Sequence, residues 1–444
     1  LGVPKALRNI VFPFNYNNLD ELEALINEYP IGVIKMEVTR NVEPKNNFLD
    51  AVRKICDKHG IILVFDECTS GFREAFGGLH KKYNVEPDLA IFAKALGNGY
   101  AINAVIGQIR ASSDAFYKSK LSPWSEWLTG QQGEAPDSDF DPLKFMVDEC
   151  HKRNMEFHAW FNPFRAVSHT RFSSVSEDHI TTIKPEWFFK YGNSVYYNPG
   201  IPEVRKYICE IVKEVVQNYD IDGVHFDDYF YPYSIEGEVI PDETQFIKHA
   251  RGCDNIQDWR RDNINLLIQE VNETIKAEKP YVKFGVSPLA IWRNHKQDPE
   301  GSFTNSGQSS YDNLYCDTKL WIEEKWVDYM APQLYWSTSN KFANYNHLIN
   351  WWTRDEYDRH LYVGHAIYKL NTKNRHSFGT DELIKQVNIS RQNGRVNGNI
   401  YFRAKAFVSN HQNFQKSIGE SIYKYPSLVP AMKWIDSIAP SKPH

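Results

Sequence analysis

Short apolar runs with the composition of buried strands recur between residues 102 and 405, and helical stretches separate them. The runs are INAVIGQIR (102–110), EFHAWFNPFR (156–165), DGVHFDD (222–228), KFGVSPL (283–289), DYMAPQLYW (328–336), HLYVGHAIY (360–368) and GNIYFRAK (398–405). Repeated alternation of strand and helix favours an α/β fold in which a parallel sheet closes into a (β/α)8 barrel. Because seven runs are present, the barrel is predicted to lack one strand.

The stretches between these runs have the spacing of amphipathic helices. In PEVRKYICEIVKEVVQNY, one helix face carries five apolar residues: Val204, Ile208, Ile211, Val212 and Val215. A helix between two neighbouring strands implies that the strands are parallel and that the crossover is right-handed. The helical spacing therefore supports the barrel.

Composition excludes some classes of partner. The chain has 444 residues and a net charge of −5, which gives no reason to expect nucleic acid or an anionic membrane as a partner. We expect no membrane span and no signal peptide, although the chain starts at Leu1. The six cysteines have no zinc-like spacing, so no metal site is predicted. Aromatic residues make up 14% of the chain, a richness that suits a carbohydrate cleft as well as an ordinary core.

Polar residues cluster at the carboxyl ends of the predicted strands, where barrels build their active sites. They are Gln108, Arg110, His158, Asn162, His225, Asp227, Ser287, Gln333 and Tyr335. In DGVHFDD, the period-two alternation of a strand places His225 and Asp227 on the lumen face and Val224 and Phe226 toward the helices. Asp228 then begins the loop.

An inward carboxylate at a strand tip, with aromatic loops around it, suits glycoside hydrolysis. That reaction needs one carboxylate as nucleophile or base and a second carboxyl group as acid. The same pattern allows a structural role, in which Asp227 only holds the side chain of Arg110 or His158 in place. The residues alone leave both interpretations open.

The first hundred residues follow a different pattern. IGVIKMEV and IILVFDEC are buried-strand runs, and the amphipathic helix NNFLDAVRKICDKHG, closed by Gly60, lies between them. Together they predict a β-α-β unit. Asp66 and Glu67 end the second strand, where α/β sheets bind ligands, although a loop-fixing role for Asp66 fits the pattern equally.

LVFDECTSGFR followed by DLAIFAKALGNGY resembles the middle of a class III aminotransferase of the glutamate-1-semialdehyde type, over about residues 1–107. The resemblance implies that Asp66 pairs with the pyridine nitrogen of pyridoxal phosphate and that Lys94 forms the Schiff base. The phosphate cradle and the small domain of that family do not appear in the sequence. We therefore expect a vestigial cofactor site that is not occupied, with an incomplete aminotransferase or aminomutase as the alternative function.

Six sequence words in order resemble the glycosyl hydrolase-like 10 family, over about residues 102–435. They are DAFYKSKLSPWSEWLTGQQG, HAWFNPFRA, DGVHFDDYFYP, GVSPLAIWRN, DYMAPQLYW and GHAIYKL. This family consists of bacterial, usually exported barrel proteins, and the resemblance implies cleavage of glycan strands, notably peptidoglycan stripped of its peptides. It also implies a glycan partner, no required cofactor, and a periplasmic or extracellular location, with the cytoplasm as the alternative. A glycan-binding or inactive fusion protein is a further alternative.

The same resemblance implies roles for individual residues. By analogy with related barrels, the Asp that ends the fourth strand is the nucleophile, which falls on Asp227. The second carboxyl group stays open among Asp228, Asp114 and Glu238. The residues implied to bind substrate are Arg110, Asp114, His158, Asn162, Arg165, His225, Tyr229, Trp292, Arg293, Gln333 and Tyr335.

The sequence is therefore predicted to join two unrelated pieces, with the boundary between residues 100 and 107. We expect a partial aminotransferase-like α/β segment over 1–100, a glycoside hydrolase-like barrel over 101–425 and a Pro-rich tail over 426–444. The barrel family's first strand is missing, and an open barrel exposes two sheet edges. We hypothesise that residues 60–67 fill this gap and that residues 87–99 act as the first barrel helix. The oligomeric state is left open.

Overall fold

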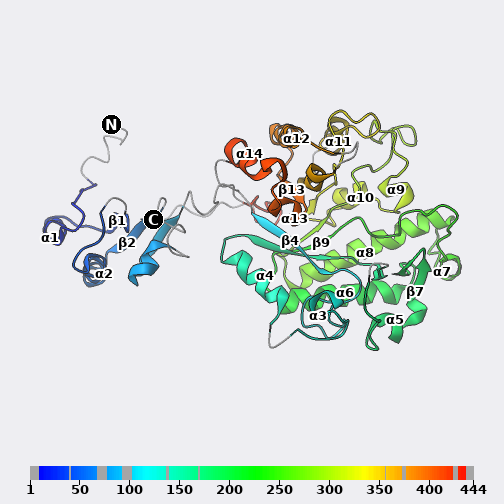
Figure 1. The fold of residues 1–444 in the computed structure, drawn as a ribbon, viewed down its shortest axis with the longest axis horizontal. Helices are drawn as coiled ribbons and strands as arrows, with labels where there is room; N and C mark the ends of the chain where they lie inside the picture. Colours follow the sequence, from blue (N-terminus) through cyan, green and yellow to red (C-terminus); the bar gives the residue numbers. More distant parts are fainter. Residues whose placement is uncertain are drawn as a thin grey trace. The chain divides into compact units, whose positions relative to one another are not determined.

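The protein divides into two compact units in a computed structural model (Figure 1). The first unit is Leu1–Ile102 with Gly419–Ser427, and the second is Asn103–Ile418 with Leu428–His444. The structure describes residues 10–39, 42–67, 78–92, 103–136, 140–168, 171–355, 357–372, 377–423 and 429–436. Lys94 and the first part of the predicted boundary lie outside the described residues.

The first unit holds a three-stranded parallel sheet in the order β1-β2-β3. Its elements are α1 (Leu19–Glu28), β1 (Val33–Met36), α2 (Phe48–His59), β2 (Ile62–Glu67), the 3-10 helix η2 (Leu79–Tyr83) and β3 (Leu89–Phe92). Helix α2 ends at Gly60, whose φ of 67° lies in the left-handed region that glycine adopts readily, and the Gly60 N–H donates to Cys56 O. The predicted β-α-β unit is confirmed, because α2 connects the parallel strands β1 and β2.

The hypothesis that residues 60–67 complete the barrel is wrong. Strand β2 has a neighbour on each side within the small sheet, since Val64 pairs with Lys35 of β1 and with Leu89 of β3. A helix over 87–99 is also wrong for residues 89–92, which form β3, and residues 93–99 lie outside the described residues. The apolar run LAIF is too short for its spacing to separate a helix from a strand.

The second unit is built on a seven-stranded parallel sheet in the order β13-β12-β11-β10-β9-β5-β4. Figure 1 labels β4, β9 and β13 of this sheet. Its strands are β4 (Ala104–Arg110), β5 (Glu156–Phe161), β9 (Gly223–Phe226), β10 (Lys283–Val286), β11 (Tyr329–Met330), β12 (His360–Ala366) and β13 (Gly398–Phe402). Each strand lies within one of the seven predicted runs, so this part of the prediction is confirmed. The sheet is a curled half-barrel in which β4 and β13 have no second neighbour among the described strands.

Helices alternate with these strands and cover the sheet. The α-helices of the second unit are α3 (Glu126–Thr129), α4 (Pro142–His151), α5 (Ile180–Ile183), α6 (Pro202–Asn218), α7 (Glu243–Lys248), α8 (Ile256–Glu278), α9 (Ser310–Asn313), α10 (Thr318–Glu323), α11 (Tyr345–Trp352), α12 (Thr380–Gln392), α13 (Ala404–Val408) and α14 (Phe414–Ser421). The 3-10 helices are η4 (Pro185–Trp187), η5 (Ile367–Asn371) and η6 (His411–Asn413). The predicted apolar face of α6 is confirmed, because its five residues are all buried.

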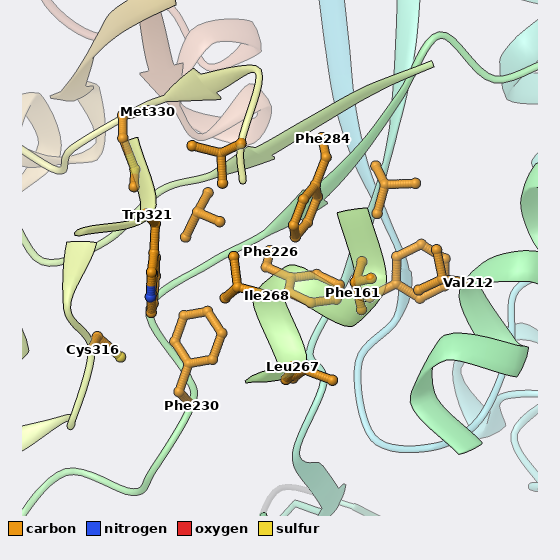
Figure 2. Close-up of a cluster of buried hydrophobic side chains, with 14 of the residues drawn as sticks. Phe161, Val212, Phe226, Phe230, Leu267, Ile268, Phe284, Cys316, Trp321 and Met330 are labelled. Carbon is orange, nitrogen blue, oxygen red and sulfur yellow. The ribbon is translucent and has the colours of Figure 1, made fainter. Parts of the chain in front are cut away.

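The main core fills the space between the sheet and these helices (Figure 2). Phe226 of β9 packs edge-on against Phe284 of β10, with ring centroids 5.2 Å apart. Figure 2 shows these rings beside Val212 of α6 and Leu267 of α8. Burying such side chains stabilises the fold by about 1.5–3 kcal/mol each. This packing fixes which face of β9 looks away from the helices.

A second, antiparallel sheet interrupts the alternation between β5 and α6. It has the order β6-β8-β7 and consists of β6 (Arg165–Val167), β7 (Phe188–Tyr191) and β8 (Ser194–Tyr197). The predicted run 156–165 is therefore two strands, because β5 ends at Phe161 and Arg165 begins a strand of another sheet. Asn162 and Pro163, which lie between the two strands, suit a turn.

Part of the Pro-rich tail is packed onto the second unit. The indole N–H of Trp434 donates to Asp328 Oδ1 at 3.0 Å, and its ring lies edge-on to His360 with centroids 4.7 Å apart. Asp328 precedes β11, so Trp434 covers the amino-terminal end of the sheet. Within residues 429–436 the tail has neither helix nor strand, as its aperiodic sequence predicts.

Candidate active site

Two adjacent aspartates follow β9 at the carboxyl end of the sheet, where barrels carry their active sites. Asp227 and Asp228 are 4% and 8% exposed. Asp227 Oδ2 accepts the indole N–H of Trp160 at 3.1 Å, and Oδ1 accepts the backbone N–H of Tyr229 at 3.0 Å. Asp228 Oδ2 accepts the hydroxyl of Tyr233. Each of the two carboxyl groups is thus held by its own donors.

The inward direction of Asp227 follows from strand alternation. Val224 and Phe226 belong to the core that packs against the helices. His225 and Asp227 therefore face the interior of the curled sheet, as the sequence pattern predicts. His225 contacts Tyr329 and Ser287 there, through hydrogen bonds of 2.9 Å each.

Burial dominates the electrostatics of the aspartate pair. Burial first, and then the neighbouring charge of Asp228, raise the pKa of Asp227 to about 8, against the opposing effects of Tyr229, Arg165 and Trp160. The pKa of Asp228 is also raised by burial, against the hydrogen bonds from Tyr233 and Gln333. Two buried carboxyl groups on consecutive residues cannot both ionise cheaply, so the pair retains a proton at neutral pH.

Aromatic side chains from several strands surround the pair. Tyr335 stacks on Phe402, with centroids 6.2 Å apart and an interplanar angle of 15°. Phe402 in turn lies edge-on to Trp160 at 6.5 Å. The guanidinium of Arg165 lies 4.1 Å from the centroid of the Tyr229 ring, a cation–π contact. Flat rings beside carboxyl groups are the surfaces on which sugar faces stack.

The amide side chains of Asn162 and Gln333 also lie beside the aspartate pair. Asn162 Oδ1 accepts from the indole of Trp160 at 3.1 Å and from Gln108 Nε2 at 3.4 Å, so Asn162 and Asp227 share one indole N–H. Gln333 donates to Ser287 O at 2.8 Å and also bonds Asp228. The structure therefore brings together most of the predicted site: Gln333, Tyr335, Asn162, Arg165, Tyr229, Asp227 and Asp228.

His158 and His225 lie in the interior of the curled sheet, and both form a hydrogen bond with the hydroxyl of Tyr329. The Tyr329 hydroxyl is 2.8 Å from His158 Nδ1 and 2.9 Å from His225 Nδ1. His158 Nε2 lies 3.0 Å from the Glu156 carboxylate, which also binds Lys283. Both rings are 4% exposed, so they support the site from beneath rather than line a sugar cleft.

The direction of this hydrogen-bond chain follows from its chemistry. Burial lowers the pKa of His225 to about 3, so this ring is neutral. A carboxylate only accepts, so His158 donates Nε2–H to Glu156, and in the tautomer that carries only this ring proton its Nδ1 accepts the Tyr329 hydroxyl. The Tyr329 oxygen then accepts from His225 Nδ1, and His225 Nε2 accepts the hydroxyl of Ser287. The chain runs from Ser287 toward Glu156.

Arg110 does not lie beside the aspartates, and a β-bulge is the reason. The register between β4 and β5 shifts between Gln108 and Arg110, which breaks the alternation that would place both on one face. Arg110 is 1% exposed and donates to the hydroxyl of Tyr197 at 3.0 Å. The contacts therefore contradict the alternative in which Asp227 holds Arg110 or His158, because each of these two residues binds other partners.

Three further predicted residues lie apart from the aspartate pair. Asp114 accepts from Gln132 Nε2 at 3.2 Å in the loop after β4. The indole N–H of Trp292 donates to Asp317 at 3.0 Å, and Arg293 forms ion pairs with acidic loop residues. Trp292 and Arg293 thus fix the loop that follows β10.

Sequence reasoning did not single out Trp160, Tyr233 or Phe402, which contact the pair or its walls. Trp160 carried a usable signal, since Phe157, Ala159 and Phe161 of β5 are core residues and alternation then turns His158 and Trp160 inward. Trp160 and Tyr233 donate to the two carboxyl groups, and Phe402 lies edge-on to Trp160. Phe402 could not be found locally, because only the curl of the sheet brings β13 toward β5.

Of the two residues predicted to bind pyridoxal phosphate, only Asp66 lies in the part of the chain that the structure describes. Asp66 ends β2 in the first unit, and its Oδ2 lies 2.7 Å from Lys35 Nζ. Lys94 lies outside the described residues. Among the side chains that the structure describes, no group of three or more His, Cys, Asp or Glu could hold a metal ion. Within the same ranges, no helix combines the length and apolar character that a membrane crossing requires.

Two family models match the chain. The class-III aminotransferase family matches residues 40–117, and the glycosyl hydrolase-like 10 family matches residues 90–379. Glutamate-1-semialdehyde 2,1-aminomutase of Citrifermentans bemidjiense is 41% identical over 113 residues, which cover 24% of this chain and 26% of that protein. Both predicted resemblances are confirmed, and the two matches overlap around the predicted boundary.

The barrel part has long matches. The glycoside hydrolase domain of PgaB (BpsB) from Bordetella bronchiseptica aligns with a TM-score of 0.46 and 13% identity, over 71% of this chain and 88% of that chain. Glycosyl hydrolase YngK of Bacillus subtilis is 48% identical over 347 residues, which cover 77% of this chain and 68% of that protein. The chain therefore belongs to the glycosyl hydrolase-like 10 family, and its residues 40–117 are similar to class-III aminotransferases.

Proposed function

We propose that the protein hydrolyses glycosidic bonds in the glycan strands of bacterial cell walls, namely peptidoglycan stripped of its peptides or a related glycan. The observation that carries the proposal is the buried pair Asp227 and Asp228 at the carboxyl end of β9. The pair holds a proton at neutral pH because burial raises the pKa of both groups. Glycoside hydrolysis requires one protonated and one ionised carboxyl group, and this pair supplies both.

The chemistry follows from that division. The protonated carboxyl gives its proton to the glycosidic oxygen while the bond from C1 to that oxygen breaks. The ionised carboxylate either bonds C1 directly or takes a proton from a water molecule whose oxygen bonds C1. The two carboxyl groups share one proton, so the pKa of about 8 describes the pair, and we assign the remaining negative charge to Asp227, because the indole of Trp160 and the N–H of Tyr229 both donate to it. Asp228 then supplies the proton.

The surrounding residues bind and orient the sugar. Tyr335 and Phe402 offer stacked ring faces, and Tyr229 is 38% exposed beside the pair. Asn162 and Gln333 offer amide groups that hydrogen-bond sugar hydroxyls. Positioning a sugar against fixed carboxyl groups lowers the barrier by the entropy already lost on binding.

We propose that this hydrolysis needs no cofactor and that the first unit holds no pyridoxal phosphate. The residues present fit that group poorly, since the ammonium of Lys35 lies 2.7 Å from Asp66 Oδ2 and competes with a pyridine nitrogen for this carboxylate. Purified protein should therefore show no yellow absorbance band that borohydride removes. Such a band would support the aminotransferase alternative.

We also propose a periplasmic or extracellular location, because the glycan strands of the cell wall lie outside the cytoplasm. Fractionation of the native host with an antibody against the barrel checks this. Recovery of the protein in the cytoplasmic fraction alone would contradict it.

The decisive experiment is digestion of peptide-free peptidoglycan strands by the wild-type protein and by Asp227→Asn. We expect the wild type to release shorter glycans and Asp227→Asn to lose activity by roughly a thousandfold or more, the scale of a lost catalytic group. Asp254→Asn is the matched control, because Asp254 is an exposed carboxylate in the same unit. Equal cleavage by Asp227→Asn would remove the assigned role. Binding of strands by a wild type that never cleaves them would indicate the glycan-binding alternative.

A further inference from the structure

A pocket of about 210 Å³ lies next to the aspartate pair. Its polar lining includes Gln108, Asp114, Glu126, Gln132, Arg165 and Arg171. Two of these residues connect it to the site: Gln108 donates to Asn162, and Arg165 lies over the ring of Tyr229. The volume is below the roughly 300–1,000 Å³ of pockets for drug-sized ligands, so the pocket suits one sugar substituent or part of one ring.

The acidic side chains of this pocket already have structural partners. Glu126 is 4% exposed and accepts the backbone N–H groups of Phe172 and Ser173, at 3.2 and 2.7 Å. Asp114 is 2% exposed and accepts from Gln132 at 3.2 Å. Burial raises the pKa of Asp114, which weakens its negative charge in the pocket. Both acids are thus held by neutral donors, and neither forms an ion pair with an arginine among the residues that the structure describes.

The arginines around the pocket likewise form no ion pair with the residues that the structure describes. This holds for Arg165 and Arg171, which line the pocket, and for the buried Arg110. Arg110 is nearly fully buried, and its guanidinium is held by the hydroxyls of Tyr197 and Ser122. A buried guanidinium without a carboxylate partner is costly in a folded protein. The charge of Arg110 acts on the pocket lining, because it lowers the pKa of Asp114 against the larger effect of burial.

We propose that this pocket binds the carboxylate of an acidic sugar next to the bond that is cleaved, with Arg171 and Arg165 as its anchors. A guanidinium binds a carboxylate through two parallel N–H donors, which adds direction to charge. The amides of Gln108 and Gln132 supply further donors at the same surface. The inference rests on the proposed hydrolase function and names the part of the substrate that the barrel selects.

Two kinds of sugar carry such a carboxylate. One is a muramyl unit, whose lactyl ether ends in a carboxylate, and the other is a uronic acid, which has the carboxylate at C6. Neutral glycans such as chitin have neither. Selection for the carboxylate thus separates this protein from hydrolases that act on neutral amino-sugar polymers.

The test compares peptide-free peptidoglycan strands with the same strands after reduction of the lactyl carboxyl to an alcohol. We expect the kcat/KM of the wild type to be roughly tenfold or more higher on the intact strands, the equivalent of one good ionic contact. For Arg171→Gln we expect the ratio of the two kcat/KM values to fall to about one. Arg171→Lys should retain part of the ratio, because it keeps the charge and loses the bidentate geometry.

Lys190→Gln is the matched control, because Lys190 is an exposed cation on β7. It should leave the ratio as in the wild type. Melting temperatures of all variants show whether Arg171→Gln folds. A ratio near one in the wild type, or an unchanged ratio in Arg171→Gln, would overturn the proposal.

A binding measurement separates this proposal from the hydrolase proposal. Calorimetric titration of Asp227→Asn with intact and reduced strands measures carboxylate selection without turnover. Selective binding without any cleavage by the wild type supports the pocket and contradicts hydrolysis, while cleavage with equal rates on both strands does the reverse. An oligogalacturonate that competes with the intact strands, where the reduced strands do not, identifies a uronic acid as the source of the carboxylate.

Discussion

Trp160 donates its indole N–H to Asp227 Oδ2 at 3.1 Å, and the two residues come from the neighbouring strands β5 and β9. The donor stabilises the ionised form of Asp227 and therefore lowers its pKa against the larger effect of burial. It also holds one carboxylate oxygen, Oδ2, while the backbone N–H of Tyr229 holds the other, Oδ1.

Trp160→Phe tests this contact. We expect kcat to fall by about tenfold, the cost of one lost hydrogen bond to a charged group, and the pKa of the pair in the kcat/KM profile to move upward. Trp187→Phe is the control, because Trp187 packs beside Tyr207 away from the pair. An unchanged pH profile in Trp160→Phe would mean that the indole does not act on the ionisation.

Asp227→Asn should also change the stability of the fold with pH. The folded-state pKa of about 8 lies above the unfolded value of about 4, so the group contributes its stability at low pH and loses it as the pH rises from 4 through 8. Asparagine cannot ionise. The variant should therefore melt about 2 °C or more above the wild type at pH 8.5 and gain less at pH 5. Equal shifts at both pH values, or the same trend in Asp254→Asn, would contradict the assignment.

Tyr329→Phe removes the hydroxyl that His158 and His225 share. Both rings are buried, so their Nδ1 atoms are left without this partner, and we expect a loss of about 2–4 kcal/mol in the free energy of unfolding. Urea denaturation measures it. The control is Tyr362→Phe, whose hydroxyl makes a longer contact of 3.3 Å with His360. A loss in Tyr329→Phe no larger than in the control would argue against the shared role.

Arg260 and Asp242 form a buried bidentate ion pair, with N–O distances of 2.9 and 2.5 Å. Arg260→Met leaves Asp242 buried without its partner, and we expect a loss of about 3–5 kcal/mol. Arg260→Met combined with Asp242→Leu should recover much of that loss, since no unpaired charge remains. Chemical denaturation of both variants checks this, and a double variant less stable than the single one would count against it.

Gly285 of β10 leaves no room for a side chain. A Cβ built there lies 2.0 Å from the ring of Tyr329, so Gly285→Ala forces that ring out of the network it organises. We expect a loss of roughly 3 kcal/mol or more in the free energy of unfolding, at the upper end of overpacking effects. Gly307→Ala, where nothing lies within 4 Å, is the matched control and should stay within about 0.5 kcal/mol of the wild type.

The sequence by itself determined the seven barrel strands, the β-α-β unit ahead of them, the two family resemblances and the inward direction of Asp227. These rest on local periods, since alternation and helical spacing are written into each run of residues. The aspartate pair followed from the same alternation, because Phe226 and Val224 had to face the helices. Local pattern therefore located the candidate catalytic centre.

Only the tertiary structure decided which distant residues join that centre. The bulge before Arg110 and the placement of β2 between β1 and β3 depend on pairing partners that a local pattern does not specify. Trp160 and Phe402 meet through the curl of the sheet. The raised pKa of Asp227 arises in the same way, because burial and a neighbouring charge exist only after the chain has folded around the pair.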